Sequence, residues 1–112
     1  MHGNNELSVD QRQVARKVLR VKAMLVMDGA PPVAARTVDI TPSGICLSAG
    51  QSLKTGLQGQ ISFEMYFGGA SHIITARASV THCIFSGNEF KVGFQFLDLG
   101  LAALSTITKY MR

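Results

Sequence analysis

Hydrophobic and polar positions alternate along most of the chain between residues 21 and 96. In the clearest stretch, 61–67, Ile, Phe, Met and Phe alternate with Ser, Glu and Tyr. A period of two residues is typical of strands that bury one face and expose the other. Gly- and Pro-containing turns separate these stretches, as in Asp-Gly-Ala-Pro-Pro at 28–32. The pattern predicts six strands, at about residues 21–27, 33–40, 45–48, 61–67, 74–81 and 90–96.

The period changes only near the C-terminus, where Leu101, Leu104, Ile107 and Met111 recur at spacings of three and four residues. This spacing predicts one apolar face of a short helix. Strands and helices do not alternate, which excludes a parallel nucleotide-binding sheet. The economical arrangement is an all-β fold: a six-stranded antiparallel barrel with a short C-terminal helix, whose closure also removes exposed edge strands.

The composition fits one domain with a single hydrophobic core. The chain has 112 residues, of which 46% are apolar, and this is too hydrophobic for a disordered protein. We expect residues 1–11 to be a flexible lead-in and residues 12–112 to form the barrel domain, including a basic arm at 12–20. No apolar run approaches the length of a membrane span and no signal peptide opens the sequence, so we expect a cytoplasmic location.

The sequence offers little support for catalysis or metal binding. Cys46 and Cys83 form no CxxC pair and are expected to be free thiols in or near the core. No GxSxG, Walker, HExxH or GxGxxG motif occurs. His72 and His82 flank the fifth predicted strand ten residues apart, where we expect them to share a face as structural or solvated side chains. We therefore predict a protein that is not an enzyme, with no catalytic residue and no metal.

Positive charge is concentrated in one segment. The net charge is +4, and no acidic residue interrupts the basic residues of segment 12–22, which are Arg12, Arg16, Lys17, Arg20 and Lys22. Such a cluster favours an anionic partner: nucleic acid, a lipid headgroup or a phosphorylated small molecule. Arg16 and Arg20 precede the first strand and could converge on one ligand, since guanidinium groups bind phosphate bidentately and stack on or read guanine. Taken alone, the segment could equally be a solvated basic arm.

A second candidate segment, residues 39–44, joins the second and third predicted strands. Asp39 and Thr41 alternate, so their side chains are expected on the same face. A carboxylate there can accept hydrogen bonds from N1–H and N2–H of guanine. Pro42 and Gly44 suit a tight turn, with Gly44 expected to allow a positive φ. Taken alone, this could be an ordinary β-turn.

Together the two segments resemble the signature of the PilZ family, RxxxR in an N-terminal arm and (D/N)xSxxG after the second strand. Thr41 stands where serine is usual, and the hydroxyl is kept. The order of strands and helix and the ending at 92–99 also resemble the family. The resemblance implies cyclic di-GMP as the ligand. The ligand-binding residues that it implies are Arg16, Arg20, Asp39, Thr41 and Gly44, with Arg12, Lys17 and Ser43 as further contacts.

The resemblance further implies a receptor module in which the ligand orders the arm and so signals to a partner, either an effector protein or a covalently linked domain. Residues 12–14 resemble the arm of PilZ modules in bacterial cellulose synthase catalytic subunits, which would place the module at the cytoplasmic face of the inner membrane. One alternative is a small barrel that binds single-stranded nucleic acid. Against it, the aromatic side chains occupy the core-facing parity of their strands; these are Phe63, Phe67, Phe90, Phe94 and Phe96. The other alternative is a PilZ-like interaction module without a ligand.

Overall fold

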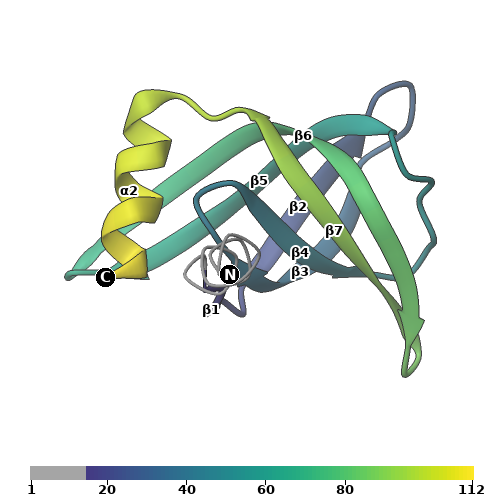
Figure 1. Ribbon diagram of the computed structural model, residues 1–112, viewed down its shortest axis with the longest axis horizontal. Helices are drawn as coiled ribbons and strands as arrows, with labels where there is room; N and C mark the ends of the chain where they lie inside the picture. The colour runs from purple at the N-terminus through teal and green to yellow at the C-terminus, as the bar shows by residue number, and fades with distance from the viewer. Residues whose placement is uncertain (1–14) are drawn as a thin grey trace, which may run out of the picture.

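The computed structural model describes residues 15–112, in which six antiparallel strands close into a barrel (Figure 1). The barrel strands are β2 (Lys22–Met27), β3 (Val33–Ile40), β4 (Gly44–Ala49), β5 (Gln58–Phe67), β6 (Ala70–Ser86) and β7 (Glu89–Asp98). They follow the order β3-β2-β5-β6-β7-β4, and pairing of β3 with β4 completes the circle. A helix, α2 (Leu101–Met111), follows the last strand. The predicted barrel with a C-terminal helix is confirmed.

A short strand that the sequence pattern did not predict, β1 (Lys17–Val18), lies in the arm and pairs with the end of β3. Between β1 and β2, Thr37 of β3 binds the arm through its side chain. Its buried hydroxyl accepts a hydrogen bond from the Val21 amide at 2.9 Å and donates one to the Leu19 carbonyl at 2.5 Å. The arm is thus fastened to β3 by a side chain as well as by strand pairing.

Strand β6 is longer than predicted, with 17 residues instead of the expected eight at 74–81. Tight hairpins bound it on both sides. Gly68 and Gly69 take φ values of 61° and 77° before it, the two consecutive positive values of a type I′ hairpin loop. After it, Gly87 takes 66° and Asn88 has no positive φ, which fits a type II′ loop. The pairing register of β6 with β7 shifts between Val80 and His82, because Thr81 forms a β-bulge. The bulge interrupts the alternation, which is why the sequence pattern stops at residue 81.

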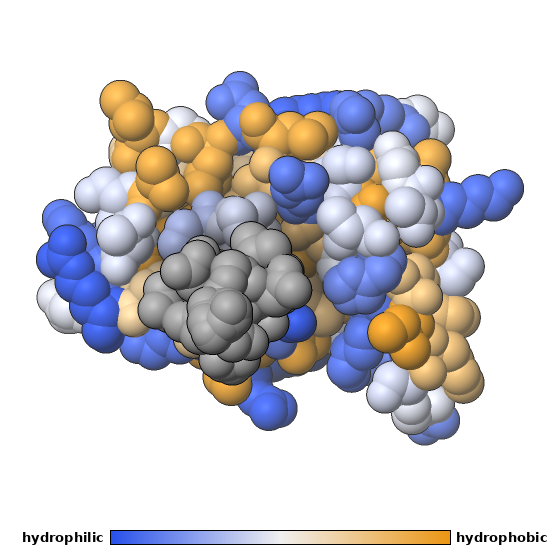
Figure 2. Space-filling view, in the orientation of Figure 1, coloured by the Kyte–Doolittle hydropathy of each residue, from blue (hydrophilic) through white to orange (hydrophobic). Residues whose placement is uncertain are grey.

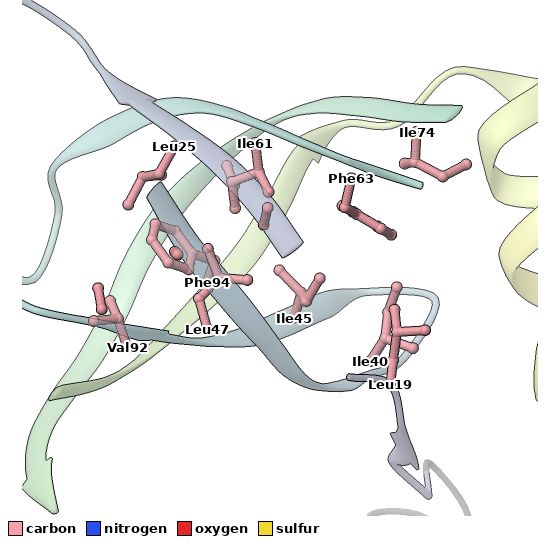
Figure 3. Close-up of a cluster of buried hydrophobic side chains, with 14 of the residues drawn as sticks. Leu19, Leu25, Ile40, Ile45, Leu47, Ile61, Phe63, Ile74, Val92 and Phe94 are labelled. Carbon is pink, nitrogen blue, oxygen red and sulfur yellow. The ribbon is translucent and has the colours of Figure 1, made fainter. Parts of the chain in front are cut away.

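Side chains from all six barrel strands fill one core (Figure 3). Leu25, Leu47, Ile61 and Val92 have no exposed surface. Leu19 is also buried and lies beside Ile40 in Figure 3, so the arm contributes to the core. The expected core-facing aromatic residues are confirmed: Phe63 and Phe94 are buried, and Phe67, Phe90 and Phe96 pack against the core. The space inside the barrel is therefore occupied, and a ligand site must lie on its outer surface.

The predicted apolar face of the helix is wrong at its N-terminal end. Leu101 is 86% exposed, whereas Ile107 is fully buried and Ala103 packs against the core. The reason is that α2 is held to the barrel through its last turn: Tyr110 donates its hydroxyl to the Val18 carbonyl at 2.8 Å. The tyrosine ring also lies 5.6 Å from that of Phe67.

Exposed apolar side chains gather near the two ends of the face in Figure 2, over α2 and over the tip of the β6–β7 hairpin. Near the helix they include Leu97, Leu101 and Leu104, and at the hairpin they include Ile84 and Phe85. Within residues 15–112, no helix has the length and apolar character that crossing a bilayer requires.

Candidate functional site

A small pocket of about 140 Å³ lies where the arm meets β3, β4, β6 and β7. We call it the arm pocket. Its floor is on the outer surface of the barrel, since Cys46 and Gly93 alternate with the core residues Leu47 and Val92. The residues that line it are Arg16, Asp39, Thr41, Gly44, Ile45, Cys46, Thr81, His82, Gly93 and Phe94.

Arg16 and Asp39 meet at this pocket because β1 pairs with β3, with Val18 opposite Asp39. The Nη1 atom of Arg16 lies 3.9 Å from Oδ2 of Asp39. The arginine side chain is 62% exposed and the aspartate side chain 22%. The cation is therefore free to turn toward an anion in solvent, whereas the carboxylate is held at the wall.

Thr41 uses its hydroxyl to hold the turn between β3 and β4. The oxygen accepts hydrogen bonds from the amides of Ser43 at 3.1 Å and Gly44 at 3.0 Å, and the Thr41 amide donates to the Gly44 carbonyl at 2.9 Å. This is the pattern by which hydroxyl side chains stabilise turns. The Ser43 hydroxyl lies 3.1 Å from the Thr41 hydroxyl. Contact of Thr41 or Ser43 with a base edge stays a prediction.

Gly44 is needed for a different reason from the one that the sequence suggested. Among the described residues the glycines with positive φ are Gly29, Gly56, Gly68, Gly69 and Gly87, so the expectation of a positive φ at Gly44 is wrong. A Cβ at Gly44 would instead collide with the backbone carbonyl oxygen of Phe94. The absence of a side chain lets β4 lie close to β7 beneath the pocket.

The other predicted arm residues lie in different places. Arg20 is exposed but does not line the pocket. Lys17 is directed to the helix. Its ammonium group donates a hydrogen bond to the backbone carbonyl of Tyr110 at 2.7 Å and lies 4.5 Å from the centre of the Tyr110 ring. Arg12 falls outside the described residues. The structure thus brings together Arg16 with the second motif, and contacts from Arg12, Lys17 and Arg20 stay predictions.

Thr81 and His82 line the pocket although the sequence analysis gave them no role there. The bulge at Thr81 turns His82 outward, opposite Gly93. His72, in contrast, lies opposite the buried Met65 and stacks on Phe67 with ring centres 4.6 Å apart. The expectation that the two histidines share a face is therefore wrong. The available signal was the pair of polar residues Thr81-His82, which ends the alternating stretch 74–81.

Cys46 forms part of the pocket floor as a free thiol, and Cys83 is free as well. Burial, reinforced by the nearby carboxylate of Asp39, raises the pKa of the Cys46 thiol. A raised pKa keeps the thiol protonated and a weak nucleophile at neutral pH. In the part of the chain that the structure describes, no three His, Cys, Asp or Glu side chains come together as a metal site would require.

A larger hollow of about 650 Å³ lies elsewhere on the barrel. Its walls include the apolar residues Met24, Phe63 and Ile73. The charged residues around it are Lys22, Arg36, Glu64 and Glu89, two of each sign. It contains none of the predicted ligand-binding residues, whereas Arg16, Asp39, Thr41 and Gly44 line the smaller arm pocket, which is therefore the better candidate site.

Comparison with known proteins gives a family and a fold for this chain. The PilZ domain family model matches residues 10–112. A comparison with curated proteins gave no match. Among solved structures, the inhibitor of motility MotI/DgrA of Bacillus subtilis is similar with a TM-score of 0.78 and 14% identity over 88% of this chain and 48% of that chain. The PilZ domain of Escherichia coli YcgR with c-di-GMP is similar with a TM-score of 0.61 and 13% identity, over 81% of this chain and 78% of that chain.

The PlzA protein of Borreliella burgdorferi in complex with c-di-GMP gives a TM-score of 0.55 and 16% identity over 96% of this chain and 46% of that chain. The chain therefore spans about half the length of the MotI/DgrA and PlzA chains, 48% and 46%. At these identities the likeness establishes the fold.

Proposed function

Because the chain belongs to the PilZ domain family, we propose that it is a receptor module for cyclic di-GMP that regulates a partner and catalyses no reaction. The observation that carries the proposal is the meeting of Arg16, from the arm, with Asp39, Thr41 and Gly44, from the β3–β4 segment, around one pocket. Two of the structural relatives, YcgR and PlzA, are complexes with c-di-GMP.

The chemistry of the pocket suits a guanine dinucleotide. The carboxylate of Asp39 can accept hydrogen bonds from N1–H and N2–H of one guanine, and the exposed guanidinium of Arg16 can bind a phosphate or stack on a base. Adenine presents a different polar edge, and unpaired polar groups in the site would disfavour it strongly. We expect selectivity for guanine dinucleotides over cyclic di-AMP.

The volume of the pocket bears on the role of the arm. At about 140 Å³ it is smaller than the roughly 300–1,000 Å³ of sites that enclose a whole small molecule. One base can enter while the rest of the dinucleotide lies on the barrel surface, within reach of the arm. The proposed switch is the ordering of arm residues 12–20 over the bound ligand, with Arg20 turned toward it.

Strand pairing and Tyr110 already hold Lys17 and Val18, so the proposed movement falls on the arginine side chains and on the arm before Lys17. The ordered arm would offer a new surface to an effector protein or to a covalently linked domain. The more specific form of this proposal is a module of a cellulose synthase at the cytoplasmic face of the inner membrane. It depends on the resemblance of residues 12–14, which lie outside the residues that the structure describes.

The decisive experiment is isothermal titration calorimetry with cyclic di-GMP, GTP, GMP and cyclic di-AMP. We expect binding of cyclic di-GMP alone, and loss of binding in Arg20→Ala and Asp39→Ala with an unchanged far-UV circular dichroism spectrum. Lys54→Ala is the matched control, since Lys54 is an exposed cation in the loop before β5. If the wild-type chain shows no binding of cyclic di-GMP, the proposal is refuted and an interaction module without a ligand is favoured.

Single-stranded nucleic acid is the less favoured ligand. Nucleic-acid-binding barrels stack bases on exposed aromatic rings, whereas the predicted core-facing Phe residues of this barrel pack in or against the core. A salt-dependent gel shift with a single-stranded oligonucleotide, together with no heat of binding for cyclic di-GMP, would reverse this preference.

A further inference from the structure

His82 belongs to a continuous row of residues that crosses the outer surface of the barrel at the arm pocket. Asp39 on β3 pairs with Cys46 on β4, Cys46 pairs with Gly93 on β7, and Gly93 pairs with His82 on β6. The two middle residues are small, so the row forms a trough with a carboxylate at one end and an imidazole at the other. The row lies outside the arm motif, and only Asp39 belongs to the second motif.

The bulge at Thr81 is what gives the row its imidazole. In an unbroken alternation after Val80, which faces the core, His82 would face the core as well. The extra residue shifts the phase by one, so that His82 faces outward and Cys83 packs against the core. Bulges are common next to functional sites, where they redirect a side chain.

The imidazole covers Gly93 with one face of its ring. A Cβ built on Gly93 would lie 2.5 Å from Nδ1 and 2.6 Å from Nε2, and closest to Cε1 between them. The nitrogens, at 2.5 and 2.6 Å, are only slightly further from this position than Cε1 at 2.1 Å. So small a difference corresponds to an approach perpendicular to the ring, since an approach in the ring plane would leave both nitrogens markedly further away. Gly93 is accordingly buried, whereas His82 is exposed. The second face of the ring is therefore open to a ligand.

Thr81 holds the ring in this orientation. Its hydroxyl lies 3.2 Å from Nδ1 of His82, within hydrogen-bonding distance. The imidazole is thus supported at its face by Gly93 and at one nitrogen by Thr81. A flat aromatic side chain fixed in this way is a platform on which a nucleobase can stack.

We propose that His82 contacts the ligand, and that the open face of its imidazole stacks on the guanine whose polar edge Asp39 reads. The inference rests on the proposed function and adds to it a residue that the arm motif and the β3–β4 motif do not contain. Adjacent strands are about 4.8 Å apart, so the row from Asp39 to His82 covers three strand spacings. A purine that is hydrogen-bonded to Asp39 can lie over Cys46 and reach the open face of the imidazole that covers Gly93.

The test is calorimetric titration of cyclic di-GMP into the wild-type chain and three variants, His82→Ala, His82→Phe and His82→Gln. Base–aromatic stacking contributes about 1–3 kcal/mol, so His82→Ala should weaken binding about five-fold or more. His82→Phe keeps an aromatic face and should bind within about two-fold of wild type, whereas His82→Gln keeps polarity without a ring and should resemble His82→Ala. His72→Ala is the matched control, a histidine of the same strand packed on Phe67 away from the pocket.

Gly93→Ala gives an independent test, because its methyl group would displace the imidazole. We expect it to weaken binding about as much as His82→Ala, and to add little further loss when both are combined. Unchanged affinity in His82→Ala, or retention in His82→Gln with loss in His82→Phe, overturns the stacking role and leaves the proposed function standing. A wild-type chain without affinity for cyclic di-GMP overturns both.

Discussion

The guanidinium of Arg16 lies 3.9 Å from the carboxylate of Asp39, which joins the arm to β3 at the arm pocket. Because the arginine side chain is 62% exposed, solvent screens this pair and its contribution to stability is small. The position of the pair is more informative than its strength. It places the arm's cation beside the carboxylate proposed to read guanine, before any ligand contributes a contact of its own.

Replacing Arg16 should therefore separate stability from binding. We expect Arg16→Ala to change the free energy of unfolding by less than about 0.5 kcal/mol. Hydrogen bonds to charged groups contribute about 1.5–3 kcal/mol, so the affinity for cyclic di-GMP should fall about ten-fold or more. Urea unfolding and calorimetry measure the two quantities. Equal affinity in the variant and the wild type would remove Arg16 from the site.

Gly44 should tolerate no side chain, because a Cβ there meets backbone rather than a movable group. Overpacking typically costs about 1–3 kcal/mol, and we expect Gly44→Ala to reach the upper part of this range in urea unfolding. Gly50→Ala is the matched control: Gly50 has no positive φ, and its Cβ would meet nothing within 4 Å. A Gly44→Ala variant as stable as Gly50→Ala would contradict the close approach of β4 and β7.

The sequence predicted the barrel well because its strands bury one face. Burial of one face requires an apolar residue at every second position, as at Ile61 and Phe63. The resemblance to the PilZ signature also predicted that Arg16 and Arg20 would meet Asp39, Thr41 and Gly44. Arg16 and the β3–β4 residues do line one pocket, whereas Arg20 does not line it. Their contacts with a ligand stay predictions.

Features set by contacts between distant residues escaped the pattern. The outward orientation of His82 depends on one bulge residue, and the need for glycine at residue 44 depends on the carbonyl of Phe94. The segment that follows β1 is bound by the hydroxyl of Thr37, 18 positions further along the chain from Leu19. The contacts of Gly44 and Thr37 leave no periodic signal in the sequence, and the bulge leaves only a break in the alternation at residues 81–82.

Thr37 should matter more for stability than an ordinary surface threonine. Thr37→Val keeps the shape but leaves the Val21 amide and the Leu19 carbonyl without their hydroxyl partner. A buried polar group left without a partner costs about 1–3 kcal/mol, and we expect a loss of this size in urea unfolding. Thr75→Val, at an exposed position on β6, should change stability by less than about 0.5 kcal/mol. Equal effects of the two substitutions would show that the arm is not fastened through Thr37.

Acid should weaken the contact between the β2–β3 turn and β6. Arg77 donates two hydrogen bonds of 2.7 Å to Asp28, and they lower the pKa of this carboxyl below its usual value. A carboxyl with a lower pKa in the folded state stabilises the protein above its unfolded pKa of about 3.9, and this contribution is lost as the pH falls through the folded value.

Wild type should accordingly be more stable than Asp28→Asn at pH 7, and the difference should shrink toward zero as the pH is lowered below about 4. Urea unfolding at a series of pH values measures it. If the stability difference between wild type and Asp28→Asn instead grew as the pH fell, the ion pair with Arg77 would not be what stabilises the folded state at neutral pH.

β1 and β2 pair with the same edge of β3, and the unequal lengths of the two pairings determine which would separate first under mechanical tension. Four residue pairs join β2 to this edge, whereas two pairs join β1 to it. Under tension applied to the N-terminal end, the arm would peel from the sheet first and the barrel would yield only at higher force. Such a pull would therefore open the arm pocket while the barrel stays folded.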